Sequence, residues 1–359
     1  MTERELHGIQ TLCEANAPSG FEDETVRAAR EALKDVCDVE EDHLRNLYLY
    51  RKRNTGNKPV LMLDAHSDEV GFMVHSIRPS GTLRVVQLGG WNRATLPGAA
   101  VSVRVRDGSW IPGVIAAKPP HFMSAAEKER AGAPEIRELA VDVGATSAAE
   151  AEAVFGVRIG EPVVPDTPFR YDAEKGLFFG KAFDCRIGCA ALIEVMRRIA
   201  DEDLAIDVVG ALSAQEEVGE RGCMVTVNRI RPDAALVFEG CPADDTFGEP
   251  YAMQTKLKNG PMIRFMDNSV ICNPRFVRFA LDLAEQRNIP AQAAVREGGG
   301  NDAAIIQTRL SGAPAIVLGV PVRYIHTPAC IAAADDYEAT VALAIAAIHA
   351  LNASVIQSF

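Results

Sequence analysis

Acidic residues and histidines follow five apolar runs in this sequence. They are His66 with Asp68, Asp184, the adjacent Glu216 and Glu217, Glu239, and His326. In open α/β sheets ligands bind beyond the carboxyl ends of strands, so polar residues at these places are candidates for a functional site. The two imidazoles and three of these carboxylates would supply the mixed ligands that a pair of divalent ions such as zinc, cobalt or manganese takes. Together they predict a two-metal centre in which one carboxylate bridges the ions.

Each place also has an ordinary structural interpretation. Asp184 precedes a predicted helix, where Asp commonly caps the first turn. Glu216 and Glu217 repel each other near a core, so a metal or Arg221 must compensate them unless the pair lies in a solvated loop. The last two places are equally consistent with a helix cap and a loop histidine. Only the combination of all five favours a metal centre.

His66 and Asp68 stand two residues apart in VLMLDAHSDEVGFMV. In an extended chain this spacing puts both side chains on one face. Asp68 is then placed to bond the ring nitrogen that does not bind metal, which fixes the tautomer and raises the basicity of the imidazole. A lone histidine is more often structural than a ligand. The His66–Asp68 pair therefore indicates a metal site only in combination with the other candidates.

The order of predicted elements is typical of an α/β fold. Helical runs over residues 5–15 and 22–36, separated by the breaker APSG, lead to the strand-like LYLYR and VLMLDAH. After residue 180, helices over 187–199 and 274–286 alternate with the strands IDVVGALSA, AALVFEG and APAIVLGV, and a last helix follows. The loop REGGGND, between a short strand and a helix, has no Lys-Ser/Thr after it and does not by itself indicate phosphate binding.

The α/β pattern is interrupted by short β-rich runs between residues 71 and 165. In VSVRVRDGSWIPGVI, Asp107 and Gly108 between alternating apolar residues predict a hairpin. We therefore expect a catalytic domain formed by residues 1–70 and 166–359, with residues 71–165 inserted as a small β-barrel or sandwich.

Composition excludes several classes of function. The 359 residues are 48% hydrophobic and 24% charged, with no apolar run near the length of a membrane span, so we expect a soluble protein. The amino terminus MTERELHGIQ has no apolar signal region, which predicts a cytoplasmic protein. A net charge of −12 without a Lys/Arg cluster argues against nucleic-acid binding. The eight cysteines show no CxxC pairing and indicate neither a disulfide framework nor a zinc knuckle.

The chain strongly resembles the tetrahedral aminopeptidases, dinuclear metallopeptidases related to glutamyl aminopeptidase, some of which carry an endoglucanase label. The resemblance is carried in order along nearly the whole chain by AHSDEVGFMV, GVIAAKPPHF, LAVDVGATSAAEAEAVFGVRIGEPVV, GKAFDCRIGCA, SAQEEVGERG, GGGNDAA and RYIHTP. It implies that one metal site includes His66 and Glu239, the other includes Glu217 and His326, and Asp184 bridges them. It also places Glu216 on the catalytic base and Asp68 on the carboxylate behind the metal-bound histidine.

The same resemblance implies a three-layer α/β/α catalytic domain of the zinc-peptidase type with an inserted PDZ-like β-barrel. In the family that insertion helps subunits assemble into a tetrahedral homododecamer. Three positions depart from many relatives: Cys185 replaces Asn, Glu239 replaces Asp and Asn301 replaces Thr. None removes a type of ligand, although Glu239 is one methylene longer than Asp and Cys185 adjoins Asp184. A packed thiol is the simpler interpretation of Cys185.

These ligands predict hydrolysis of the N-terminal residue from short peptides, with Glu216 as general base and two divalent ions, zinc foremost, as cofactors. Two-metal N-deacylases and carboxypeptidases of related fold stay open as alternatives, to be separated by blocked against free amino termini. A glycosidase is disfavoured, because adjacent Glu216 and Glu217 do not flank a bond from opposite sides. A non-enzymatic binding protein is disfavoured by the retention of every predicted ligand.

Overall fold

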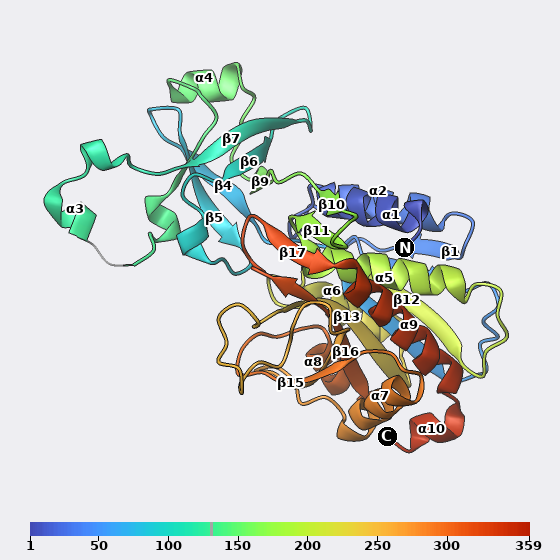
Figure 1. Cartoon of the computed structure of the whole chain (residues 1–359). Coiled ribbons are helices and arrows are strands. Elements are labelled where there is room, and N and C mark those ends of the chain that lie inside the picture. Colours follow the sequence, from blue (N-terminus) through green and yellow to red (C-terminus); the bar gives the residue numbers. More distant parts are fainter. Residues whose placement is uncertain (130–131) are drawn as a thin grey trace. The chain divides into compact units, whose positions relative to one another are not determined.

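The computed structural model describes residues 1–129 and 132–359 (Figure 1). Within these residues the chain forms two compact units. The first comprises residues 1–69, 169–325 and 330–359, and the second comprises residues 70–168 and 326–329. The long apolar segments, which form the strands of one sheet, belong to the first unit. The short β-rich runs belong to the second.

Eleven described strands of the first unit form one sheet, with the path order β1-β2-β12-β3-β13-β16-β17-β11-β10, and β14 and β15 join it through β16. The strands are β1 (Asp38–Glu41), β2 (Leu47–Tyr50), β3 (Val60–His66), β10 (Arg170–Asp172), β11 (Leu177–Gly180), β12 (Asp207–Ser213), β13 (Ala234–Pro242), β14 (Met262–Met266), β15 (Gln292–Val295), β16 (Ala315–Arg323) and β17 (Cys330–Ala333).

The centre of this sheet is parallel. β12 pairs with β3, β3 with β13, and β13 with β16, all in parallel, so their carboxyl ends meet at one edge. β12 is buried along its whole length and β13 up to its last residue, as near-continuous apolar strands covered on both faces should be. The α/β fold class predicted from the element order is confirmed.

Helices cover both faces of the sheet (Figure 1). α5 packs on β3 and β13, and α1 and α9 pack against α5. α6 packs on β12, α8 packs on β16, and these two helices also contact each other. The helices of the first unit are α1 (Glu3–Glu14), α2 (Asp23–Leu33), α5 (Phe183–Arg198), α6 (Arg221–Ile230), α7 (Pro274–Gln286), α8 (Ala303–Thr308), α9 (Ala334–Ala350) and α10 (Ala353–Gln357). The helix predicted over 274–286 has those same bounds. Its start is defined by Asn273, whose side chain accepts from two backbone N–H groups, and by Pro274 at the first position.

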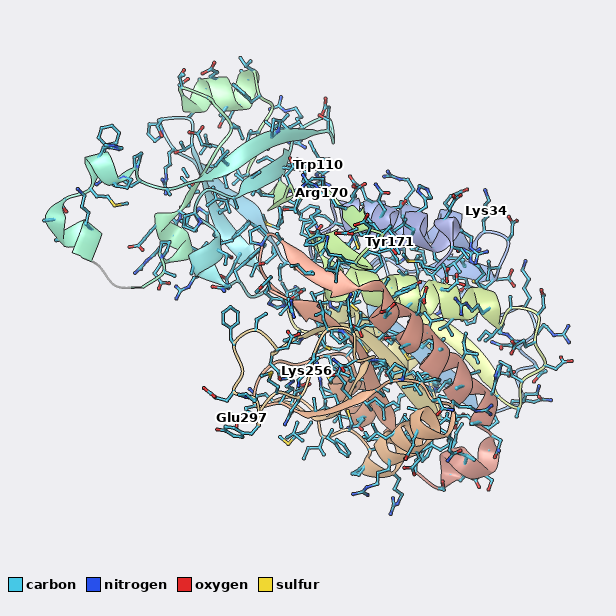
Figure 2. The ribbon with its side chains drawn as sticks, viewed as in Figure 1. Lys34, Trp110, Arg170, Tyr171, Lys256 and Glu297 are labelled. Atoms are coloured by element: carbon cyan, nitrogen blue, oxygen red, sulfur yellow. The ribbon has the colours of Figure 1, made fainter. Side chains whose placement is uncertain are left out.

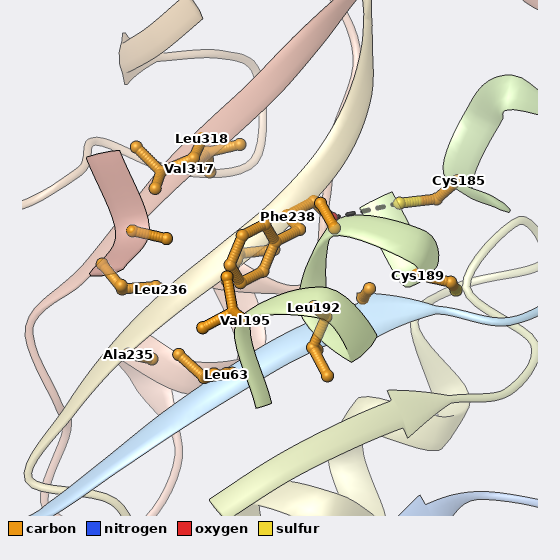
Figure 3. Close-up of a cluster of buried hydrophobic side chains, with 14 of the residues drawn as sticks. Leu63, Cys185, Cys189, Leu192, Val195, Ala235, Leu236, Phe238, Val317 and Leu318 are labelled. Carbon is orange, nitrogen blue, oxygen red and sulfur yellow. Dashed lines mark hydrogen bonds between the residues drawn. The ribbon is translucent and has the colours of Figure 1, made fainter. Parts of the chain in front are cut away.

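The core under α5 consists of large apolar side chains from three elements (Figure 3). Phe238 of β13 lies beside Leu192 and Val195 of α5, and Leu63 of β3 borders them. All four are fully buried. Each such side chain stabilises the fold by about 1.5–3 kcal/mol relative to an exposed one, so this layer fixes α5 firmly against the strands.

The second unit contains a closed barrel of six strands in the order β4-β5-β8-β7-β6-β9. They are β4 (Gly71–Ile77), β5 (Leu83–Leu88), β6 (Ala100–Arg104), β7 (Trp110–Ala116), β8 (Ala140–Asp142) and β9 (Pro162–Pro165), accompanied by the short helices α3 (Ala125–Glu129) and α4 (Ala148–Ala153). β6 and β7 form the predicted hairpin, with Gly108 at φ 86° in its turn. The barrel encloses Phe72, Val103 and Val163 among other buried side chains.

Charged side chains project from the surface of the first unit, as Lys34, Lys256 and Glu297 show (Figure 2). None of the helices in the described ranges is both long enough and apolar enough to cross a membrane.

Candidate metal centre

β3 ends in His66, and Asp68 lies two residues further on. Both side chains are buried, and Nδ1 of His66 lies 3.4 Å from Oδ1 of Asp68. Burial disfavours the charged form of Asp68, but the neighbouring imidazole of His66 and a hydrogen bond from Ser19 hold its pKa below the usual value. Asp68 thus lies beside one ring nitrogen of His66, and the other, Nε2, faces the carboxylate of Asp184.

Asp184 approaches that second nitrogen from the start of α5. Its Oδ1 lies 2.9 Å from Nε2 of His66. α5 begins after Ala182 at φ 56°, and its backbone is non-helical at Asp184 and Cys185, so the regular helix follows these two residues.

Glu216 and Glu217 occupy the turn between β12 and α6. Oε2 of Glu216 lies 4.0 Å from Nε2 of His66. Burial raises the pKa of both carboxyls well above the usual value, with His66 opposing the shift and neighbouring carboxylates adding to it. Arg221 is exposed and donates to Oε1 of Gln215, so it does not compensate the pair.

Glu239 does not terminate its strand, as the apolar run suggested. β13 continues to Pro242 because its pairing with β16 extends through that residue, and Glu239 lies opposite Gly319 inside the ladder. Its Oε2 is 3.7 Å from Nε2 of His66. Burial raises the pKa of Glu239 well above its usual value, against the effect of His66.

Cys185 behaves as a packed thiol. Its Sγ donates to the carbonyl oxygen of Phe238 at 3.1 Å (Figure 3). Burial, and then the carboxylate of Glu239, raise its pKa well above the usual value, which keeps the thiol protonated. Its Sγ also lies within 4.8 Å of ligand atoms of His66, Asp184 and Glu239.

His326 belongs to the segment 326–329 that packs with the second unit. It has φ 56°, and its carbonyl oxygen accepts the backbone N–H of Asn92 at 3.0 Å. Its part in a metal site stays a prediction.

The donor set fits divalent cations. Ligand atoms of His66, Asp184 and Glu239 lie within 4.8 Å of one another, and so do those of His66, Glu216 and Glu217. The positive charge of Arg264 lowers the pKa of Glu239, but the guanidinium group donates its hydrogen bond to Asp267, at 2.6 Å. Buried carboxylates gathered at this density are stabilised by cations, and imidazole with carboxylates is the ligand chemistry of zinc and its neighbours.

Two further groups of residues around the site were not among the predicted site residues. Ser19 and Glu22, in and just after the APSG breaker, lie against Asp68 and the turn of Glu216. Asp64, Cys223 and Asp302 form a separate fully buried cluster, in which Asp64 accepts from Ser213 at 2.6 Å. Burial raises the pKa of Asp64 to about 6, and burial together with the charge of Asp64 raises the pKa of Asp302 well above its usual value. An acidic residue inside an apolar strand was the only available sign of it.

A covered parallel sheet with imidazole and carboxylates at its strand ends is the arrangement of an α/β metallopeptidase. The profile of the M42 glutamyl aminopeptidase family matches residues 46–343, and the chain belongs to that family. It is therefore a hydrolase, an aminopeptidase of the M42 type, for which divalent metals are implied. The resemblance drawn from the motifs is confirmed.

Individual relatives extend over nearly the whole chain. Glutamyl aminopeptidase of Lactococcus lactis is 33% identical over 330 residues, covering 92% of this chain and 91% of the relative. A TET aminopeptidase structure from a marine-sediment thaumarchaeon has a TM-score of 0.95 and 36% identity, with 99% of both chains covered. A TET1 peptidase of Pyrococcus horikoshii, described as assembling into a tetrahedron or a large octahedral shell, has a TM-score of 0.86 and 29% identity, covering 97% of this chain and 100% of that one.

Proposed function

We propose that this chain is a two-metal aminopeptidase that removes the N-terminal residue from short peptides. His66 and Glu239 would hold one ion, Glu217 and His326 would hold the other, and Asp184 would serve both. The observation that carries the proposal is the environment of one atom: Nε2 of His66 has carboxylate oxygens of Asp184, Glu239 and Glu216 at 2.9, 3.7 and 4.0 Å. Zinc is the first candidate, with cobalt and manganese next.

Bound divalent ions would lower the pKa of a water molecule and polarise the scissile carbonyl. The chain supplies the proton transfer through Glu216, which takes a proton from the attacking water and returns it to the leaving amine. Glu216 suits this role because its carboxylate lies at the edge of the donor cluster while its backbone N–H is bonded to Asp68 at 3.0 Å. Asp68 thereby sets both the imidazole of His66 and the turn that carries the base.

The test is hydrolysis of a panel of amino-acid p-nitroanilides, including glutamate, leucine and lysine derivatives. The purified protein is assayed after chelation and after zinc, cobalt or manganese is added back. Metal-restored cleavage of free-amino substrates, with N-acetylated counterparts left intact, supports the aminopeptidase. Cleavage of the acetylated series would instead indicate a deacylase, and activity that survives chelation would remove the metal mechanism. The preferred side chain follows from the same panel.

We also propose that the chain assembles into a homododecamer through its β-barrel and acts in the cytoplasm. The shells described for the Pyrococcus horikoshii relative support the assembly. Light scattering should then give a mass of twelve times the 38.7 kDa of one chain. A monomer or dimer mass over the working concentration range would contradict this.

A further inference from the structure

The segment that follows α1 is attached to the end of β3 by several bonds. The backbone N–H of Glu69 donates to the carbonyl of Ala17 at 3.2 Å, and the N–H of Ala17 donates to Oε1 of Glu69 at 3.1 Å. The ammonium group of Lys181 also donates to that carboxylate, at 3.0 Å. Residues 17 and 18 are thereby fixed beside the strand that carries His66.

A tight turn then brings Ser19 to Asp68. The N–H of Phe21 donates to the carbonyl of Pro18 at 2.8 Å, and Gly20 adopts φ 87°, a conformation that suits glycine. Oγ of Ser19 donates to Oδ2 of Asp68 at 2.6 Å, within the length range of a charge-assisted hydrogen bond. Ser19 is 4% exposed, so water does not readily replace this bond.

Glu22 contacts the turn that carries Glu216 and Glu217, at the residue just before them. Its Oε1 accepts the backbone N–H of Gly20 at 2.7 Å and that of Gln215 at 3.2 Å. Glu22 is fully buried. A buried carboxyl is expensive for a fold and is kept where it satisfies backbone donors that nothing else reaches.

The combined result is that three successive backbone N–H groups are held by two buried carboxylates. Gln215 donates to Glu22, while Glu216 and Glu217 donate to Asp68 at 3.0 and 3.2 Å. Gln215 itself has φ 57°, a left-handed conformation that a non-glycine residue keeps only when its surroundings enforce it. The directions of the side chains of Glu216 and Glu217 follow from this backbone.

We propose that Ser19 and Glu22 are positioning residues of the active site, which hold the backbone of residues 215–217 so that Glu216 meets the substrate water in a fixed geometry. The proposal rests on the proposed role of Glu216. Ser19 bonds to Asp68 and Glu22 bonds to the backbone of Gln215, so their effect is on the placement of the base. Displacement of a reacting group by about 1 Å lowers rates by about a hundredfold, which makes such a clamp consequential.

The experiment compares Ser19→Ala and Glu22→Ala with Ser19→Thr and Glu22→Gln, which keep the hydroxyl donor and the carbonyl acceptor. With zinc or cobalt bound and the best p-nitroanilide of the panel, both alanine variants should lose about tenfold or more in kcat, with KM within about twofold. The conservative variants should recover most of that loss, and all four should bind the same metal equivalents as the wild type. Thr25→Val is the matched control and should keep kcat, because Thr25 is fully buried in α2 and its hydroxyl makes no hydrogen bond to any described residue.

Hydrogen exchange supplies a readout that does not depend on activity. Mass spectrometry of the peptide that covers residues 214–217 should show faster amide exchange in Ser19→Ala and Glu22→Ala than in the wild type or Thr25→Val. Wild-type kcat together with wild-type exchange in the alanine variants would overturn the proposal, and so would a loss of kcat that matches a loss of bound metal. If Glu22→Ala fails to fold, the Ser19 pair decides the matter. A wild type that cleaves no substrate would reject the proposed function, whereas the exchange data would still decide whether the clamp exists.

Discussion

Nε2 of His66, at the end of β3, lies 2.9 Å from Oδ1 of Asp184, 118 positions later in the chain. The carboxylates of Glu239 and Glu216 reach the same nitrogen from two further segments. Because one imidazole is shared by several acidic groups, removal of any one of them changes the charge balance for the others. Substitutions here should therefore separate metal binding from proton transfer.

Glu216→Gln should keep its metals and lose turnover by about 10²- to 10⁴-fold, the range for removal of a general base. The amide is isosteric with the carboxylate but accepts no proton at neutral pH. Metal content by mass spectrometry and kcat on the best p-nitroanilide test this. Glu220→Gln, a nearby carboxylate outside the donor cluster, is the control and should keep wild-type kcat.

Asp184→Asn should lose bound metal rather than turnover alone. A bridging carboxylate supports both ions, and the amide carries no charge to offset them. We expect fewer metal equivalents per chain than in the wild type, whereas Glu216→Gln should match the wild type. Full metal content in Asp184→Asn would contradict the bridging role.

Chelation should lower the midpoint of thermal unfolding as well as abolish activity. Ions that bind only the folded state stabilise it by about 2.7 kcal/mol when present at a hundred times their dissociation constant. Differential scanning calorimetry with and without chelator, followed by addition of zinc, measures the effect. An unchanged midpoint would mean that the buried carboxylates are satisfied by protons instead.

Gly240→Ala should damage the site, because an added Cβ would lie 2.5 Å from the carbonyl oxygen of Phe183 and 2.9 Å from the backbone nitrogen of Asp184. The resulting shift would separate Glu239 from Asp184, so both stability and activity should fall. Gly8→Ala is the matched control, since its added Cβ meets no atom within 4 Å on the described chain. In the interior of α1 it should stabilise the protein by about 0.5–1 kcal/mol. The unfolding free energies of the two variants in urea test the contrast.

Glu5 should make part of the stability depend on pH. Burial alone would raise its pKa, but hydrogen bonds from Thr2 and Arg198 lower it to about 2. Since the folded pKa lies below the unfolded value, the ionised Glu5 stabilises the fold above about pH 4.5, and this contribution is lost as the pH falls from 4.5 towards 2. Glu5→Gln should cost about 1–2 kcal/mol at pH 7 and less at pH 4, as measured by urea unfolding at the two pH values. An equal cost at both would refute the assignment.

Local patterns along the chain were enough to predict the fold class and the parts of the site that lie at strand ends. Apolar runs of strand length and amphipathic helices repeat with periods that the backbone itself imposes, so the hairpin at Gly108 and the helix over 274–286 were readable directly. His66 and Asp68 were readable as neighbours for the same reason, because two residues of spacing determine the shared face of an extended chain.

Only the tertiary structure decided which segments meet. The continuation of β13 past Glu239 depends on its pairing with β16, and the position of Arg221 beside Gln215 depends on the turn before α6. Ser19 and Glu22 reach Asp68 and Gln215 through hydrogen bonds that close long loops. Such bonds form when the whole sheet brings their partners together, and no periodicity in the sequence encodes which partner a buried hydroxyl or carboxyl will find.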